Sequence, residues 1–451
     1  MRALLFNPNQ MRLVTKPGKI YNRIWPPLEL ANSAALLEAE GHSVRITDAH
    51  ALGMKPEHVT RCAVGFDKVF ISSSSLDRWQ CPTPDLGPFL ASVERLRKTT
   101  DEVYVLGVHG TLRPQEILNL TAARAVIRGE PEGTIVEICR GTPLRDIRGI
   151  AFREDGRIIV NQDREPVNLD ELPPPALHLL PMEKYCYEVL GPRFTLFEGS
   201  RGCASRCSFC LLAMYGRGLR RKSPARLIRE VDLAISRFGV KTAYFMDLEF
   251  TAIRGAVMEL CDHLIRKRYD FRWTCQTRLD LVDEELLESM RRAGCRLIHF
   301  GVEAGTDRFL NKINKGITTA QIRDGLGLVR RAGIDSACFF MLGFPDEDED
   351  ELERTVRFAR ELNPTYALFH QVTPYPGTPL YDEIQKNAPS IFAEGPFPEA
   401  CFDGEALKKL KRTIRRAYLG YYLRPGYIAA RLSRGDLRSL LGQVKLLWGY
   451  L

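Results

Sequence analysis

The sequence predicts an α/β protein with two successive series of strand–helix units and a helical C-terminal stretch. Three observations lead to this prediction. Short apolar runs that end in Gly, Pro, Ser or Asp alternate with amphipathic helical patterns. The alternation breaks once, in a proline-rich segment, and then resumes. Towards the C-terminus only helical periodicity remains. Alternating strands and helices imply parallel sheets with helices on their faces.

The bulk composition is that of an ordinary globular protein. The 451 residues predict two or three domains, and 45% hydrophobic with 27% charged residues excludes a disordered chain. No apolar run reaches the ~18–20 residues that span a bilayer, and the N-terminal MRALLFNPNQ lacks the apolar core of a secretion signal. We therefore expect a cytoplasmic protein without a transmembrane segment. The twelve cysteines are scattered, unlike a disulfide scaffold, except for one cluster.

The first series covers residues 1–145. Its helical pattern PLELANSAALLEAEG stops at Gly41, a typical helix end. The candidate strands are RALLFNP, HSVRITDA, KVFISSSS, VYVLGVHG and AVIRGEP. Five such units predict a flavodoxin-like (Rossmann-type) domain, in which ligands bind at the carboxyl ends of the strands.

Residues 146–190 have a different character. GIAFREDGRIIVNQDREPV predicts a β-hairpin that turns at Glu154-Asp155-Gly156. The proline-rich NLDELPPPALHLLP follows and reads as a connector. We expect the domain boundary here.

The second series covers residues 191–395. Its candidate strands are FTLFEGS, TAYFMD, RWTCQTR, LIHFGVE, ACFFMLG and YALFHQVTPYP. Six units predict a partial (β/α)6 barrel with its chemistry at the strand carboxyl ends. Residues 396–451 then form a basic helical region. Such a region can bind nucleic acid, an anionic membrane or an acidic electron donor. Packing on the body with solvated charges is the commoner outcome, so we expect no nucleic-acid partner.

Three cysteines lie together after the first strand of the second series. Cys203, Cys207 and Cys210 fall within the glycine-containing stretch EGSRGCASRCSFC. A cubane iron–sulfur cluster usually takes four thiolates, so three leave one iron open for a ligand. A structural zinc would need a fourth Cys or His at matching spacing, and the nearest, His178 and Cys186, precede the strand.

This C-x3-C-x2-C spacing, with an aromatic residue before the third cysteine, resembles the signature of the radical S-adenosylmethionine (SAM) superfamily. The resemblance covers residues 192–385. It implies a 4Fe–4S cluster on Cys203, Cys207 and Cys210, whose open iron chelates the amino and carboxylate groups of SAM. In that family an electron entering the cluster cleaves SAM and yields a 5′-deoxyadenosyl radical, which abstracts hydrogen from substrate.

The resemblance also assigns SAM contacts at successive strand ends. Acidic residues would take the SAM ammonium and ribose hydroxyls, an arginine its carboxylate, and an aromatic backbone with a glycine turn its adenine. The residues in these positions are Phe209, Asp247, Glu249, Gln276, Arg278, Glu303, Leu342 and Gly343. Taken singly, each has a plain alternative, since an acid at a strand end also caps helices and MLGFP also makes a tight turn.

The first domain is similar to the cobalamin-binding domain that precedes many radical SAM cores. The similarity lies in NPNQ, PPLELANSAALLEAEGHSVRITDA, VLGVHGTLRPQEI and VIRGEPEGT. It implies that hydroxyls in the Ser72–Ser75 run bind the nucleotide tail, that residues 76–78 lie under the corrin, and that glycines permit close approach. The predicted cobalamin contacts are Ser73, Ser74, Ser75, Leu76, Arg78, Gly107, His109 and Gly110.

One motif points elsewhere. Asp48–Gly53 fits D-x-H-x-x-G, in which a histidine replaces the lower base of cobalamin. In proteins that use this motif it follows the first strand, whereas here it follows the second. His50 would then lie beside the wrong loop. We expect a surface turn with Asp48 as a strand-end acid.

The two resemblances together imply a cobalamin-dependent radical SAM enzyme that methylates an unactivated carbon of a small molecule, such as a natural-product, lipid or tetrapyrrole intermediate. The expected partners are that substrate and an electron donor such as flavodoxin or ferredoxin. Ring-forming or C–C-coupling enzymes related to the anaerobic cyclase of chlorophyll synthesis remain an alternative. So does a cobalamin or iron–sulfur sensor without catalysis. A methylthiotransferase is disfavoured because Cys62, Cys81 and Cys139 do not share strand-end loops.

Overall fold

The computed structural model describes residues 1–9, 23–83, 85–393 and 397–433. Two parts of the sequence predictions fall outside these ranges. They are Gln10, the last residue of NPNQ, and residues 434–451 of the predicted helical C-terminal region.

The first sheet has seven strands in the order β2-β1-β3-β4-β5-β6-β7. The first five are parallel, and this order is that of a flavodoxin-like sheet, as predicted. The predicted hairpin adds β6 and β7 antiparallel to the edge strand β5. Its turn is formed by Asp155 and Gly156, both in the left-handed region. The strands are β1 (Arg2–Asn7), β2 (Ser43–Asp48), β3 (Lys68–Ser72), β4 (Val103–Leu106), β5 (Ala125–Ile127), β6 (Ile150–Glu154) and β7 (Arg157–Val160).

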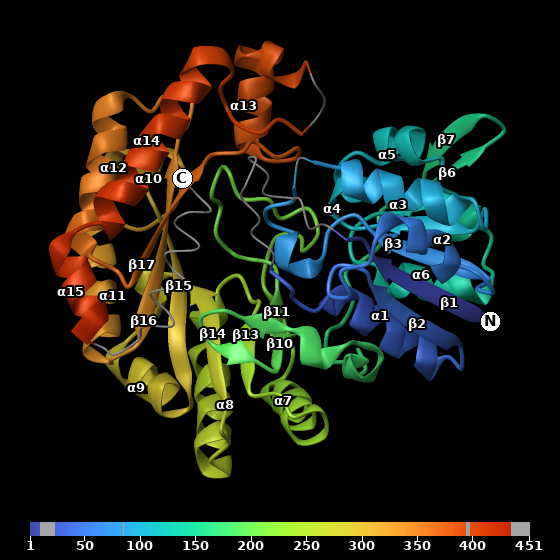
Figure 1. The fold of residues 1–451 in the computed structure, drawn as a ribbon, viewed down its shortest axis with the longest axis horizontal. Helices are drawn as coiled ribbons and strands as arrows, with labels where there is room; N and C mark the ends of the chain where they lie inside the picture. The colour runs from blue at the N-terminus through green and yellow to red at the C-terminus, as the bar shows by residue number, and fades with distance from the viewer. Residues whose placement is uncertain (10–22, 84, 394–396, 434–451) are drawn as a thin grey trace.

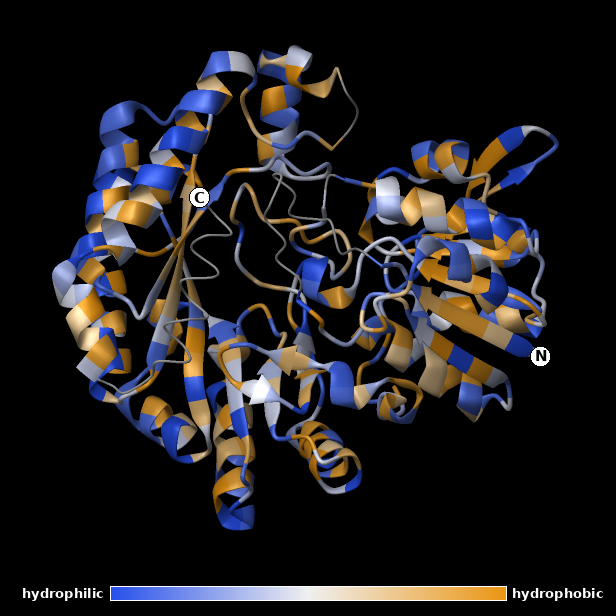
Figure 2. Cartoon of the chain, viewed as in Figure 1, coloured by the Kyte–Doolittle hydropathy of each residue, from blue (hydrophilic) through white to orange (hydrophobic). Residues whose placement is uncertain are grey.

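Helices cover both faces of this sheet because its central strands are apolar on both sides (Figure 2). Helices α1 (Leu28–Ala39) and α6 (Glu132–Arg140) pack on one face. The other face carries α2 (Val59–Cys62), α3 (Gly87–Arg97) and α5 (Pro114–Thr121). The short α4 (Val108–Leu112) follows β4 directly.

The second sheet has six parallel strands in sequence order, with helices on its outer side, so it forms an open, partial barrel (Figure 1). This confirms the predicted fold class. The strands are β10 (Phe194–Phe197), β13 (Thr242–Phe245), β14 (Arg272–Thr277), β15 (Cys295–Glu303), β16 (Asp335–Leu342) and β17 (Tyr366–Gln371). Between them lie α7 (Pro224–Phe238), α8 (Arg254–Lys267), α9 (Glu284–Arg292), α10 (Asp307–Lys312), α11 (Thr319–Arg331) and α12 (Glu349–Leu362).

Local signals fix the ends of these helices. Helix α7 buries Leu227, Val231 and Ala234 on one face and ends at Gly239 in the left-handed conformation. Helix α11 begins with a capping box between Thr318 and Gln321. Beyond the sheet, α13 (Pro379–Asn387) precedes α14 (Gly404–Tyr422), which packs along the edge strand β17, and α15 (Pro425–Ser433) follows. No helix in the described part of the chain is long and apolar enough to cross a membrane.

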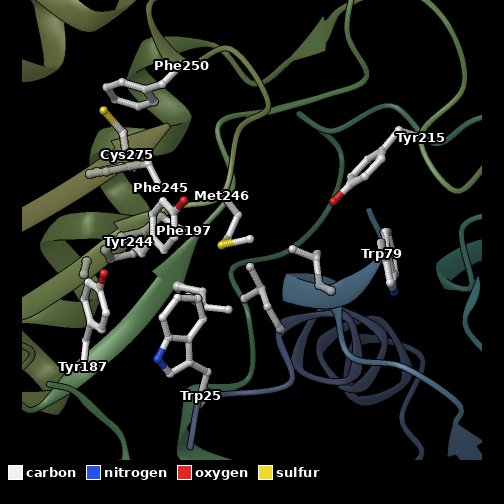
Figure 3. Close-up of a cluster of buried hydrophobic side chains, with 14 of the residues drawn as sticks. Trp25, Trp79, Tyr187, Phe197, Tyr215, Tyr244, Phe245, Met246, Phe250 and Cys275 are labelled. Carbon is white, nitrogen blue, oxygen red and sulfur yellow. The ribbon is translucent and has the colours of Figure 1, made fainter. Parts of the chain in front are cut away.

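The two sheets share one apolar core. Trp25 precedes α1, and its ring centroid lies 5.2–5.4 Å from those of Tyr187, Phe194 and Tyr244. Figure 3 shows Trp25 and Trp79 of the first unit in the same cluster as Tyr244 and Met246 of the second. The short strands β8 (Cys186–Tyr187) and β9 (Gly191–Pro192) lie in the segment that joins the units. This packing holds the first sheet against the mouth of the barrel.

Candidate functional site

The cysteine loop begins at the end of β10 and is held by backbone contacts on both sides. The short strands β11 (Ser200–Arg201) and β12 (Arg220–Arg221) pair antiparallel and close its base. Gly218 N donates to the Cys203 carbonyl at 3.3 Å. A Cβ on Gly202 would lie 2.0 Å from the Gly218 oxygen, and its φ is 87°, so only glycine fits there.

The three thiols lie on this loop, with Cys203 buried and the other two half-buried. Ser205 N donates to the Cys203 sulfur at 3.3 Å. Among the described residues no group of three or more His, Cys, Asp or Glu side chains is close enough to hold a single metal ion. In a cubane each thiolate binds a different iron, so wider spacing is required.

Burial and neighbouring carboxylates keep the cysteine thiols protonated in the metal-free chain. Burial and the charge of Glu249 raise the pKa of Cys203 to about 11. Burial also raises the pKa of Cys207 and of Cys210. Only thiolates bind iron, so loading a cluster must release protons.

Glu249 and Arg278 lie next to the cysteine loop, as predicted from their strand ends. The Glu249 carboxylate accepts a hydrogen bond from Ser205 Oγ at 2.6 Å and lies 4.0 Å from Arg278 Nε. Arg278 is held by the carbonyl oxygens of Lys315 and Gly316 at 2.7 and 2.9 Å. A carboxylate and a guanidinium side by side can bind the two ends of an amino-acid zwitterion.

Glu303 ends β15 with a φ of 69°, in the left-handed region that a non-glycine residue rarely adopts. Its buried carboxylate pairs with Lys315 Nζ at 2.9 Å. Burial lowers the pKa of Lys315, but Glu303 and Cys207 outweigh this effect and raise it. The sequence reasoning missed Lys315. No local sequence signal marked it, because Lys315 is far from the three cysteines in the chain.

Asp247 and Gln276 are tied into the protein. The Asp247 carboxylate accepts from Gly199 N at 2.9 Å and from Ser200 Oγ at 2.6 Å, so it fastens the base of the cysteine loop to β13. Burial raises its pKa to about 6. The Gln276 side-chain oxygen accepts from Tyr244 OH at 3.2 Å.

Phe209 and the MLGFP turn meet through the ring of Phe344, which lies 5.8 Å from that of Phe209. Leu342 is buried. Gly343 has a φ of 94°, and a Cβ there would lie 2.4 Å from Leu410 of α14. Its N–H donates to the Glu347 carboxylate at 2.6 Å. The glycine is therefore required by the turn and by α14, whatever else the turn binds.

The serine run after β3 is mostly engaged within its own domain, contrary to the expectation that its hydroxyls are available to a ligand. Ser72 Oγ donates to Ser74 O at 2.8 Å, and Ser75 Oγ donates to Asp77 at 2.5 Å. Ser74 Oγ accepts from Val108 N at 3.1 Å. Within the described residues, the buried Ser73 Oγ has no hydrogen-bond partner.

The residues that follow this run are also anchored. Leu76 is buried, and its N–H donates to the Glu29 carboxyl at 2.9 Å. Arg78 is half-buried, with Nε 3.9 Å from Asp77. Burial raises the pKa of Glu29 to about 8, so this carboxyl is largely neutral at pH 7.

The loop after β4 makes its close approaches to protein atoms. A Cβ on Gly107, whose φ is 104°, would lie 2.7 Å from Ser73 Oγ. A Cβ on Gly110 would lie 2.5 Å from Val126 Cγ1. His109 is fully buried, with Nε2 2.8 Å from the Thr83 carbonyl. Burial lowers its pKa to about 4, so the ring is neutral.

Residues 48–51 of the D-x-H-x-x-G segment are buried, whereas Leu52 and Gly53 are exposed, so the prediction of a surface turn holds only for the last two residues. Asp48 is the strand-end acid expected, but it accepts hydrogen bonds from Asn7 Nδ2 at 2.9 Å and Tyr185 OH at 2.8 Å. The connector residue Tyr185 covers the turn from outside the first domain. His50 Nε2 lies 3.1 Å from the Arg23 carbonyl, beside the outer strand β2.

The carboxyl ends of the first sheet face the cysteine loop and the end of β17. The rings of Trp79 and Tyr215 are 5.4 Å apart (Figure 3). Thr111 Oγ1 donates to Met214 Sδ at 3.1 Å. Tyr375 OH, beyond β17, donates to the Pro82 carbonyl at 3.2 Å. These contacts bring the carboxyl ends of the first sheet next to the cysteine loop and the end of β17.

A buried ion-pair network joins the same surfaces. Arg201, two residues before Cys203, is fully buried, and its Nη2 lies 2.6 Å from Glu132 and 2.9 Å from Glu198. Its Nη1 lies 3.3 Å from Glu130. The sequence reasoning missed this network. The adjacent acids of VIRGEPEGT and the arginine of EGSRGC were its only sequence signal.

Comparison with known proteins places the chain in a family. The model of the radical SAM superfamily matches residues 197–359. An uncharacterized methyltransferase of Pyrococcus horikoshii is 31% identical over 445 residues, covering 92% of this chain and 94% of that protein. The chain therefore belongs to the radical SAM superfamily, whose cofactors are a 4Fe–4S cluster and SAM.

Relatives and solved structures extend this likeness over both units. The anaerobic magnesium-protoporphyrin IX monomethyl ester cyclase of Rubrivivax gelatinosus is 26% identical, covering 93% of this chain and 78% of that protein. The cobalamin-dependent SAM radical enzyme OxsB is 16% identical with a TM-score of 0.75, over 100% of this chain and 72% of that one. The methyltransferase TsrM of Kitasatospora setae is 19% identical with a TM-score of 0.69, over 86% and 76%. OxsB and TsrM therefore have the same fold as this chain.

Proposed function

We propose that this radical SAM enzyme is a cobalamin-dependent methyltransferase that acts on an unactivated carbon of a small molecule. The observation that carries the proposal is the contact between the first sheet and the cysteine loop. The carboxyl ends of the first sheet, where flavodoxin-like domains bind ligands, pack against the loop of Cys203, Cys207 and Cys210. Relatives named as methyltransferases support the same reaction class.

The barrel residues would hold the cluster and SAM. Three thiolates fit a cubane with one open iron. We assign Glu249 to the SAM ammonium, Arg278 to its carboxylate and Glu303 to the ribose hydroxyls. The adenine would lie against the backbone of Phe209 and the Leu342–Gly343 turn. Asp247 and Gln276 support this site, because their side chains bind Gly199, Ser200 and Tyr244.

The chain's own charges prepare the site for these groups. Lys315 pairs with the buried Glu303 carboxylate at 2.9 Å and fixes its position, and carboxylates are strong acceptors for hydroxyls. The guanidinium of Arg278 is held by two carbonyl oxygens and by the Asp280 carboxylate, which accepts from Nε and Nη2 at 2.9 and 2.8 Å, so the SAM carboxylate would bind by displacing Asp280. When bound, the cluster supplies the electron that cleaves SAM, and cobalamin supplies the methyl group.

The first domain has atoms that fit a cobalamin nucleotide tail. Ser73 Oγ is a buried hydroxyl without a partner in the described structure, and Gly107 beside it carries no side chain. We assign Ser73, Leu76, Arg78 and Gly107 to direct contact. Ser74, Ser75 and Gly110, which are engaged with protein atoms, shape these loops instead. His109 binds the Thr83 carbonyl through Nε2, but its buried Nδ1 has no partner in the described structure, so we keep His109 as a contact.

Anaerobic reconstitution tests the cluster assignment. The wild-type chain is expected to bind about four irons, and Cys207→Ala is expected to lose the cluster. Cys62→Ala, in α2 of the first domain, is the matched control and is expected to load normally. A full cluster in Cys207→Ala would exclude Cys207 as a ligand.

A corrinoid absorption band that persists after desalting is expected, and its absence under saturating cobalamin would exclude cobalamin dependence.

Product analysis separates methylation from the second candidate. Ring formation or C–C coupling is favoured by the relative named as an anaerobic cyclase, which aligns over 93% of this chain. With SAM, a reductant and candidate substrates, methylation yields both 5′-deoxyadenosine and S-adenosylhomocysteine. Deoxyadenosine alone would favour cyclisation or coupling. A sensor would yield neither product.

A further inference from the structure

The sequence around the cysteine loop is unusually basic. Residues 199–229 contain eight Lys and Arg residues and no Asp or Glu. The net charge of the whole chain is only +8, so this one segment carries a concentrated positive charge. The basic residues are Arg201, Arg206, Arg217, Arg220, Arg221, Lys222, Arg226 and Arg229.

The fold neutralises half of these charges internally. Arg201 pairs with three buried glutamates, and Arg220 pairs with Glu130. Lys222 and Arg226 both pair with Glu230 of α7, at 2.7 and 3.3 Å. These four cations are explained by the packing of the two units and of α7.

The other four are exposed and have no ion pair with any described residue. They are Arg206, Arg217, Arg221 and Arg229. Arg229 lies on α7, whereas the other three lie on the cysteine loop or on the strand that closes it. We call Arg206, Arg217 and Arg221 the cluster-loop surface. Exposed charges contribute little to stability, so the packing of the fold does not explain these arginines.

Backbone pairing places the cluster-loop surface directly over the cysteines. Arg206 lies between Cys203 and Cys207 in the sequence. Arg217 forms an isolated β-bridge with Cys203, and the next residue, Gly218, donates to the Cys203 carbonyl at 3.3 Å. Arg221 pairs with Ser200 at the base of the loop. The exposed side chains therefore lie on the solvent side of the chain segment that carries the thiols.

We propose that the cluster-loop surface docks an acidic protein that donates one electron, of the flavodoxin class. This proposal rests on the cluster assignment made above. Electron transfer between proteins requires close approach, and opposite charges steer and orient such weak, transient complexes. The reduced donor loses one electron, the oxidised cluster gains one, and no bond or proton is exchanged in this step. A donor docked here would deliver the electron on the Cys203 side of the cluster.

The basic face of α14 provides a contrast. Arg412, Arg415 and Arg416 are also exposed and without ion pairs to the described residues. However, α14 packs along β17, and β17 and β10 are opposite edges of the second sheet. The cysteine loop follows β10, so a donor on α14 would dock beside the wrong edge. This face supplies a control with the same number and sign of charges.

The test compares charge reversal at the two surfaces. The triple variant R206E/R217E/R221E and the control R412E/R415E/R416E are reconstituted, and SAM cleavage to 5′-deoxyadenosine is measured with a reduced bacterial flavodoxin. The first variant is expected to need at least ~10-fold more flavodoxin for half-maximal rate. Its rate with photoreduced 5-deazariboflavin, a small uncharged reductant, is expected to stay within about twofold of wild type, since no docking is involved.

Binding provides a readout that does not depend on turnover. Calorimetric titration of oxidised flavodoxin into the cluster-free chain is expected to show affinity that weakens with salt, and the triple variant is expected to lose it. The control is expected to bind like wild type. If the triple variant fails to load iron, this titration still tests donor binding, because it uses the cluster-free chain. The milder single variant R217Q then replaces the triple variant.

Several results would overturn the proposal. One is an equal loss of rate with both reductants, which would show an effect on the cluster itself. Another is an equal loss in the α14 control. A third is tighter wild-type binding to a polynucleotide than to flavodoxin, abolished by the triple variant. Failure of methylation would not imitate any of these, because deoxyadenosine formation and donor binding are measured without a methyl acceptor.

Discussion

The pair of Lys315 and Glu303 shows how individual residues carry the site. Both are buried, and the carboxylate belongs to a residue held in the left-handed region. A buried ion pair is expensive to break, because the remaining charge is left unpaired and desolvated. The same pair that stabilises the end of β15 also positions the carboxylate that we assign to the ribose hydroxyls.

Lys315→Met is expected to lower the stability of the chain by about 3–5 kcal/mol, since it leaves Glu303 unpaired. SAM binding, measured calorimetrically on the reconstituted chain, is expected to weaken as well. The double variant Lys315→Met/Glu303→Gln should recover most of the lost stability but not SAM binding. Recovery of both would show that Glu303 has no role in SAM binding.

Glu29 gives a pH-dependent prediction. Burial raises its pKa from 4.5 to about 8. Because the folded-state pKa is the higher one, the bound proton stabilises the fold fully below about pH 4.5, and this contribution is lost as pH rises towards 8. The loss amounts to about 1.4 kcal/mol per pH unit within this window.

Glu29→Gln is therefore expected to flatten the fall in melting temperature between pH 5.5 and 8. Glutamine keeps an acceptor for Leu76 N but has no proton to lose. Melting curves of wild type and variant at several pH values test this. Parallel curves would mean that Glu29 titrates normally in the folded chain.

At the scale of elements, the cysteine loop depends on a close crossing of two backbone segments. Gly202 passes so near Gly218 that a Cβ would lie 2.0 Å from its oxygen. Gly216, in the same crossing segment, has a similar positive φ of 74° but open space around it. The two glycines separate steric exclusion from backbone strain.

Gly202→Ala is expected to prevent cluster assembly, because the loop must move to relieve the clash. Gly216→Ala carries only the cost of an alanine at positive φ, ~1 kcal/mol, and is expected to load iron normally. Iron content and circular dichroism of the two variants provide the measurement. Equal iron loading would show that the loop tolerates the displacement.

At the scale of the whole molecule, the buried network of Arg201 couples the two units. Arg201 lies two residues before Cys203, and Glu130 and Glu132 belong to the end of the first sheet. The ring of Trp79 lies 5.9 Å from its guanidinium. Two cross-unit carboxylates, Glu130 and Glu132, thus tie the first domain to the cysteine loop through one side chain, beside the apolar contacts of the shared core.

Arg201→Met is expected to uncouple the units, because three glutamates lose their shared cation in a buried interface. Calorimetry should then show two unfolding transitions in place of one. Arg145→Met, an exposed pair with Glu154 on the β6–β7 hairpin, is the control and is expected to change little. A single, unshifted transition in Arg201→Met would show that apolar contacts alone hold the units together.

Much of the fold could be predicted from sequence because its signals are local. The alternating apolar runs, the glycine ends and the capping residues each predict an element from its own residues. The cysteine loop was identified for the same reason, since its three thiols are close in sequence. The hairpin was also recognised, but its addition to the edge of the first sheet was not, because strand pairing depends on distant residues.

The sequence alone determined the two strand–helix series, their order and the cysteine spacing, because periodicity and short motifs are encoded within a few residues. The tertiary structure decided which polar groups are free. It engaged Ser74, Ser75 and His109 with protein atoms, buried the turn of His50, and brought Lys315 to Glu303 and Arg201 to three glutamates. Apart from the local bond of Ser75 to Asp77, these outcomes join residues from different elements. Hydrogen bonding and burial depend on such long-range contacts, and no local pattern records them.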